Sequence, residues 1–142
     1  MVHHYWRSGV RAELHNLART LRADGRPWPL VADTIRRKYR INALTALRLA
    51  HGYTQSEVAD QWCQRWPDDP KTFKNISYWE NWPGKCSREP SLIVLSRLAE
   101  IYQCAVADLV AGLGDHSYAD EIAAVPPLWH NCPHGCGWRI PA

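Results

Sequence analysis

Apolar residues recur at helical spacing through most of this chain, and this pattern limits the fold more than any other feature of the sequence. In the segments 10–23 and 90–102 they are Val10, Leu14, Leu17, Ala18 and Leu21, and then Leu92, Leu95, Leu98, Ala99 and Tyr102. A spacing of three or four residues puts such side chains on one face of an amphipathic helix. No segment alternates apolar and polar residues over a useful length, as a strand would. The sequence therefore predicts an all-α fold.

The length and composition are those of a globular protein. The 142 residues are enough to bury one hydrophobic core, and the hydrophobic fraction of 46% and charged fraction of 22% are ordinary. No stretch reaches the roughly 20 apolar residues of a membrane span. The first residues include His, Trp and Arg, where a secretory signal has an apolar core. We therefore expect one domain with short appendages, cytoplasmic and without a membrane partner.

Capping and helix-breaking residues predict where other helices begin and end. Four further segments are expected to be helical: Pro29–Lys38, Ile41–Ala50, Lys71–Asn81 and Ala105–Val110. The tetrad Thr54-Gln55-Ser56-Glu57 has the form of a capping box and predicts one more helix start. Two prolines and two aspartates predict a loop over Cys63–Pro70, with Trp66 tucked against apolar side chains.

Basic residues are concentrated in the first part of the chain. Residues 1–50 hold ten Lys and Arg residues against three acidic ones, although the net charge of the whole chain is only +3. Clustered positive charge is typical of proteins that bind nucleic acid. The same residues equally fit the solvated faces of ordinary helices, so charge alone leaves both interpretations open.

Several short blocks occur together in a characteristic order. They are Leu44–Arg48, Gly52–Ala59, Ile76–Glu80, Pro90–Leu92 and Ala107–Leu109. In this order the chain resembles the Cro/XRE family of bacterial regulators. The resemblance implies a lambda-repressor-like five-helix helix-turn-helix domain over residues 42–112. It leaves residues 1–41 as a basic N-terminal helical extension and residues 113–142 as an irregular C-terminal tail that contains Cys and His.

The resemblance also implies a function and a set of residues. The chain would be a sequence-specific transcription regulator that binds double-stranded DNA as a homodimer, with the helix 71–81 in the major groove. The residues expected at the DNA are Gln55, Lys71, Phe73, Lys74, Asn75, Ser77, Tyr78 and Lys85. Base contacts would come from positions 73, 74, 77 and 78. Gln55 would touch phosphate or brace those residues, and the lysines at 71 and 74 fit phosphate anchors better than base readers.

Helical periodicity separately predicts which side chains of the helix 71–81 are buried. With Ile76 pointing inward, a rotation of about 100° per residue puts Phe73 and Trp79 on the buried side. The side chains predicted to point outward, where they can contact phosphates and base edges, are Lys71, Lys74, Tyr78 and Asn81. The resemblance puts Phe73 near the groove instead, and we favour partial burial. Ala59 is expected to be a packing residue where two helices cross.

The sequence departs from the compact family pattern in two loops. The turn between Ala59 and Ile76 is about seven residues longer, and Trp62 and Trp66 would have to brace it. The link 81–89 is also longer, and within it Lys85 and Arg88 can reach the DNA backbone. This long-turn form resembles a variant seen in actinobacterial regulators. The alternative function is a protein-interaction module that docks a partner through the tryptophan-rich loops.

Cysteine and histidine residues gather in the tail. Four of them are zinc candidates: His130, Cys132, His134 and Cys136. Structural zinc sites pair two short Cys or His hooks, whereas only one is present here, so we expect no metal and no other cofactor. The five cysteines are an odd number, which predicts free thiols, with Cys104 as a small buried hydrophobe. The common motifs of hydrolases, metalloproteases and nucleotide-binding enzymes are missing, so we expect no enzyme.

Overall fold

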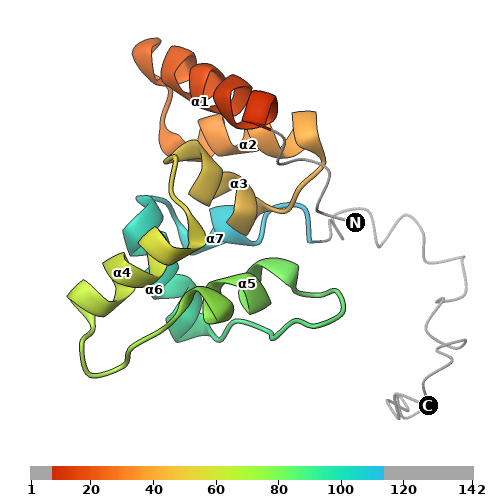
Figure 1. Ribbon diagram of the computed structural model, residues 1–142. Coiled ribbons are helices and arrows are strands. Elements are labelled where there is room, and N and C mark those ends of the chain that lie inside the picture. The colour runs from red at the N-terminus through yellow and green to blue at the C-terminus, as the bar shows by residue number, and fades with distance from the viewer. Residues whose placement is uncertain (1–7, 114–142) are drawn as a thin grey trace, which may run out of the picture.

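A computed structural model describes residues 8–113, and over that range the protein is all-helical (Figure 1). The seven helices are α1 Ser8–Ala23, α2 Trp28–Tyr39, α3 Ala43–Ala50, α4 Gln55–Arg65, α5 Phe73–Asn81, α6 Leu92–Tyr102 and α7 Val106–Leu109. Helices α1 and α2 pack together at one end, with α4, α5 and α6 at the other and α3 between them. The predicted all-α class is therefore confirmed for the described residues.

The N-terminal helices share the core of the rest of the molecule. Leu14 and Ala18 of α1 and Val31 and Ile35 of α2 belong to the same buried cluster as Leu47 of α3. The helical spacing seen in the sequence put Leu14 and Ala18 on one face, and these side chains are buried in a helix that packs against α2 and α3. Residues on both sides of position 41 thus contribute to one hydrophobic core.

Helix α4 begins as its sequence predicts and ends later. Thr54 Oγ1 accepts a hydrogen bond from Glu57 N at 3.1 Å, and Glu57 Oε2 accepts one from Thr54 N at 2.7 Å. This reciprocal pair confirms the predicted capping box. The loop predicted from Cys63 is wrong over its first three residues, because α4 continues to Arg65. Pro67 restricts only the residue before it, Trp66, so helix is allowed up to that point.

Helix α5 begins two residues later than predicted. Its first residue is Phe73, and Lys71 lies in the preceding loop. Asn75 Oδ1 accepts a hydrogen bond from Thr72 N at 2.9 Å and so closes the first turn. On the inner side α5 buries Ile76, Trp79 and Glu80.

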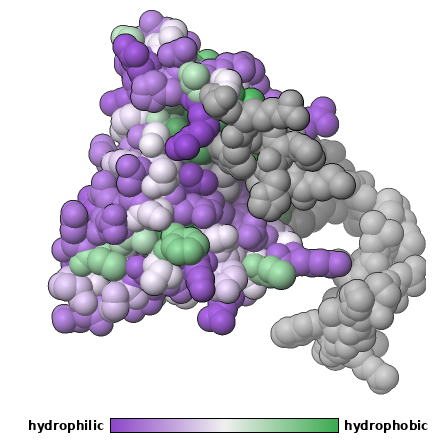
Figure 2. All heavy atoms as spheres, viewed as in Figure 1, coloured by the Kyte–Doolittle hydropathy of each residue, from purple (hydrophilic) through white to green (hydrophobic). Residues whose placement is uncertain are grey.

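The core is filled by large side chains from every helix. Trp62 of α4, Tyr102 of α6 and Leu109 of α7 are almost wholly buried, and Ala59 is buried where α4 meets its neighbours. The predicted packing role of Ala59 is therefore confirmed. Figure 2 shows a mostly hydrophilic face, with hydrophobic atoms in a few separate patches. No helix within residues 8–113 is long and apolar enough to cross a membrane.

Candidate nucleic-acid interface

A buried ion pair fixes α5 to α3. Arg48 Nε lies 2.5 Å from Glu80 Oε1, and Arg48 Nη2 donates to Glu80 Oε2 at 3.1 Å. The two side chains are only 10% and 7% exposed. Asn42 Nδ2 also donates to the backbone oxygen of Glu80. A charged pair held by two parallel hydrogen bonds permits one relative placement of its two helices, so α5 has a defined orientation.

Gln55 joins the first turn of α4 to the same pair. Its Nε2 donates to Glu80 Oε2 at 2.9 Å, and Arg48 Nη1 donates to the backbone oxygen of Tyr53 at 3.0 Å, just before α4. The Gln55 side chain thus contacts Glu80 on the inner side of α5 and none of the residues expected to contact bases. The start of α4 and the end of α5 are therefore tied to one carboxylate.

Sequence reasoning did not find Arg48 and Glu80 as partners, although a signal is present. Arg48 follows the buried Leu44 by four residues, and Glu80 follows the buried Ile76 by the same distance. Residues four apart lie on the same helix face, so each charge stands on an apolar face. Two opposite charges on two apolar faces indicate a buried pair.

The outward side of α5 carries a mixed set of side chains, which we call the α5 face. It consists of Phe73, Lys74, Ser77, Tyr78 and Asn81, while Ile76 and Trp79 point into the core. For Lys74, Tyr78 and Asn81 this agrees with the predicted rotation, whereas Phe73 was placed on the other side and Lys71, also predicted to point outward, precedes the helix. Lys74 and Tyr78 are four residues apart and therefore neighbours on this face.

Phe73 is the exception, because it is 51% exposed. The helical rotation alone put it on the buried side, which the structure does not show, but a side chain about half exposed is partly buried, as we favoured from the two placements together. Phe73 is the first residue of α5, and helical side chains lean toward the N-terminus of their helix. A side chain at this position has no preceding turn of the same helix to pack against.

Two other predicted residues make contacts within their own helix. Asn75 is half-buried, and its oxygen is used to cap Thr72. Ser77 is also half-buried, and its Oγ lies 3.5 Å from Asn81 Nδ2. The side chain of Asn75 is thus engaged in starting α5, whereas Ser77 and Asn81 remain on the outward side.

Lys71 does not lie with the other predicted residues. Its Nζ lies 2.5 Å from Asp69 Oδ1, and the same carboxylate pairs with Arg97 of α6 at 2.8 Å. The hydrogen bond from Lys71, helped by Arg97, holds the pKa of the Asp69 carboxyl below its usual range. The charge of Lys71 is therefore paired with Asp69 within the loop, and Thr72 separates Lys71 from the start of α5.

Tryptophan side chains brace the long turn between α4 and α5, as expected. Trp62 Nε1 donates to the backbone oxygen of Asp69 at 2.7 Å, and Cys63 Sγ donates to that of Lys71 at 3.3 Å. The rings of Trp62 and Trp66 meet edge to face at 5.1 Å, and the Arg97 guanidinium lies 4.8 Å from the Trp66 ring. The extra residues of the turn thus form a packed loop.

The link from α5 to α6 returns along α5. Arg88 N donates to the backbone oxygen of Tyr78 at 3.1 Å, and its guanidinium lies 5.5 Å from the Tyr78 ring centre. Lys85 is exposed in the turn before it. The structure thus brings Gln55 to the inner side of α5, Lys74 and Tyr78 to the outer side, and Arg88 beside Tyr78.

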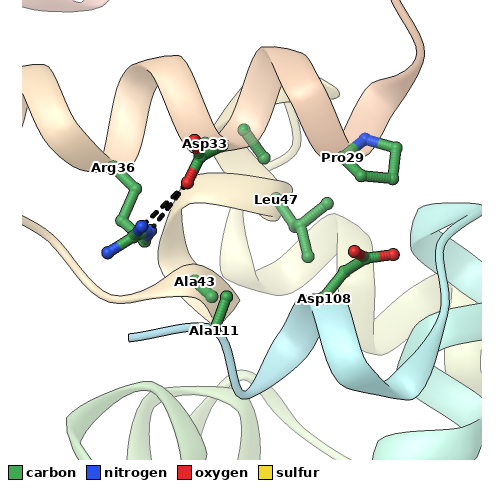
Figure 3. A pocket seen from close by; sticks show the side chains of 8 residues that line it. Pro29, Asp33, Arg36, Ala43, Leu47, Asp108 and Ala111 are labelled. Carbon is green, nitrogen blue, oxygen red and sulfur yellow. Dashed lines mark hydrogen bonds and ion pairs between the residues drawn. The ribbon is translucent and has the colours of Figure 1, made fainter. Parts of the chain in front are cut away.

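A small hollow lies apart from the α5 face, between α2, α3 and α7 (Figure 3). It encloses about 120 Å³ and is lined in part by Leu47, Asp108 and Arg36. Arg36 is paired with Asp33 at 2.8 Å, and Asp108 Oδ2 accepts a hydrogen bond from Ala105 N. These charges already have partners within the protein, so the hollow offers little chemistry to a ligand.

No metal centre emerges from the described part of the chain. Within residues 8–113 no three His, Cys, Asp or Glu side chains are grouped to hold a metal ion. The zinc candidates His130, Cys132, His134 and Cys136 lie outside the described residues. Cys63, Cys86 and Cys104 are free thiols, and burial raises the pKa of Cys104 to about 12. Cys104 is half-buried against the core, so it is less enclosed than predicted.

Comparison with known proteins found no match: no protein-family model, curated protein or solved structure is significantly similar to this chain.

Proposed function

We propose that this chain is a sequence-specific DNA-binding regulator of the Cro/XRE type. In this proposal α3 to α7 form the lambda-repressor-like domain over residues 42–112. Helices α4 and α5 are the helix-turn-helix, and α5 enters the major groove. The protein acts in the cytoplasm as a homodimer, so that two copies of α5 meet the two halves of a symmetric DNA site.

The observation that carries the proposal is the division of α5 into two chemically different sides. Its inner side is fixed by Ile76, Trp79 and the ion pair of Glu80 with Arg48. Its outer side keeps Lys74 and Tyr78 exposed. A rigid helix with an exposed polar face is what reading of base edges requires, because the reading side chains must be held in register.

Each exposed group on the α5 face has a plausible partner on DNA. The Lys74 ammonium suits a phosphate oxygen, and the Tyr78 hydroxyl and Asn81 amide can donate to or accept from base edges. The exposed ring of Phe73 can contact the methyl group of thymine. Thus the exposure of Phe73, which periodicity alone did not predict, supports the placement implied by the family resemblance.

Substitution of the α5 face tests this proposal. K74A and Y78A remove groups from exposed positions, so both variants should keep their helical content. We expect both to lose retention on DNA that wild type binds. K38A serves as a control, because Lys38 lies on α2 and is paired with Glu13. Unchanged DNA binding by both K74A and Y78A would reject the proposal.

A protein-interaction module is the second candidate, and a separate observation favours it. Leu92 and Ile93 at the start of α6 are 74% and 63% exposed, and Phe73 is also exposed. Contiguous exposed apolar patches are typical of surfaces that bind another protein, and Leu92 and Ile93 are adjacent in the sequence. Under this alternative, L92S/I93S would abolish partner binding, and K74A would leave it intact. The DNA proposal predicts that L92S/I93S retains DNA binding.

A further inference from the structure

We propose that Arg88 is a DNA-backbone contact held in position by Tyr78, an assignment that rests on the proposed function. Arg88 follows α5 by seven residues in the sequence and belongs to no helix. Its chemistry is suited to phosphate, since a guanidinium can donate two parallel hydrogen bonds to phosphate oxygens.

Two contacts attach Arg88 to α5. Its backbone N–H donates to the Tyr78 backbone oxygen at 3.1 Å, which fixes the chain beside the last turn of the helix. Its guanidinium lies 5.5 Å from the Tyr78 ring centre, within the range of a cation–π interaction. A side chain that is already restricted in the free protein loses less conformational entropy when it binds.

Arg88 also differs from most nearby cations in having no carboxylate partner. Lys71 and Arg97 are both paired with Asp69, and Arg48 is paired with Glu80. Within residues 8–113 no ion pair involves Lys74 or Arg88, and both side chains are exposed. Their charges are therefore available to a polyanion.

Lys74, Tyr78 and Arg88 form a continuous row. Tyr78 lies next to Lys74 on the α5 face, and Arg88 lies against the Tyr78 ring. The row thus has two cations that both neighbour Tyr78. When α5 lies in the major groove, Lys74 and Arg88 contact phosphates, and Tyr78 lies between them against the DNA.

The salt dependence of binding tests the charge of Arg88 directly. The probe is a short fluorescein-labelled duplex of mixed sequence, titrated by anisotropy at rising KCl concentration. The slope of log K against log salt is negative, and loss of one phosphate contact reduces its magnitude by about 0.9. Between about 50 and 200 mM salt, R88A should therefore lose about 3.5-fold less affinity than wild type. R88K, which keeps the charge, should restore most of the slope.

R65A is the matched control, because it removes the same charge at a distance from the α5 face. Arg65 ends α4 and lies 3.8 Å from Glu100 of α6. We expect R65A to keep the wild-type slope. If R88A and R65A give the same slope while K74A flattens it, the assignment of Arg88 is wrong and the proposed function stands. If wild type shows no salt-dependent binding, the proposed function itself fails.

Substitution of Tyr78 tests the positioning. The phenol is uncharged, so its loss changes the salt slope only if a cation moves with it. Y78L should reduce the magnitude of the salt slope as R88A does, and Y78F should keep the wild-type slope. The double variant Y78L/R88A should show no smaller a slope magnitude than either single variant. A wild-type slope in Y78L would overturn the positioning role of Tyr78.

Discussion

Arg48 of α3 and Glu80 of α5 form a two-bond ion pair in the interior, with Nε–Oε1 and Nη2–Oε2 distances of 2.5 and 3.1 Å. The pair links two residues that are 32 positions apart in the sequence. Gln55 adds the first turn of α4 to the same carboxylate. The proposed reading helix is therefore positioned by buried charges. Loss of one of these charges should lower the free energy of unfolding.

E80Q should destabilise the protein strongly. It removes one charge of a buried pair and leaves the Arg48 guanidinium without its counter-charge, which typically costs about 3–5 kcal/mol. The free energy of unfolding measured in urea gives the value. E100Q is the control, because Glu100 is 64% exposed and its pairing contributes about 1 kcal/mol at most. Equal losses in E80Q and E100Q would contradict the structural role of the pair.

T54A should lower stability by a smaller and separate amount. Thr54 Oγ1 caps α4, and replacement of such a cap by alanine costs about 1 kcal/mol. Ser56 is exposed within the same first turn, so S56A leaves both capping bonds in place. Urea unfolding should rank T54A below wild type and S56A close to it. A midpoint for T54A as high as that for S56A would show that the capping box contributes nothing measurable.

His51 should make the unfolding free energy depend on pH. Its ring stacks on Trp28 with centroids 3.9 Å apart, and its Nε2 lies 2.7 Å from the Tyr102 backbone oxygen. Burial, together with the nearby Arg22, lowers the pKa of His51 below its usual 6.5, despite the opposing effect of the Tyr102 carbonyl. The unfolded state therefore binds the proton more readily. The stability from this group is complete above pH 6.5 and is lost as pH falls through the lowered pKa.

The matching measurement compares urea unfolding of wild type and H51Q at about pH 7.5 and 5.5, on either side of an ordinary histidine pKa. H51Q cannot take up the proton, so the difference in stability between the two pH values should be smaller in the variant. The same pH dependence in wild type and H51Q would assign the effect to other groups.

The helices were predictable because their signals are local. Periodic apolar residues indicated α1 and α6, and the Thr54 tetrad fixed the start of α4. The end of α4 was missed because a loop-like composition begins at Cys63, whereas the actual restriction comes from Pro67 acting on Trp66. Local composition does not separate the residue that stops a helix from the helical residues just before it.

The candidate site was less predictable, because it depends on contacts between distant segments. The partner of Lys71 is Asp69, and a list of basic residues does not reveal that this charge is already used. Arg88 is brought to Tyr78 by the path of the link between α5 and α6, which periodicity does not determine. Phe73 is the first residue of α5, and a rotation counted from Ile76 does not take account of that terminal position.

Selection of bound sequences from a random duplex pool tests the central claim most directly. The full chain should enrich a defined sequence, with half-sites about 10 bp or a multiple of it apart if two copies bind. Binding to the enriched duplex should weaken steeply with salt, and K74A should lose it. Failure to enrich any sequence, with equally weak binding at all salt concentrations, would contradict the account of α5 as a DNA-reading helix.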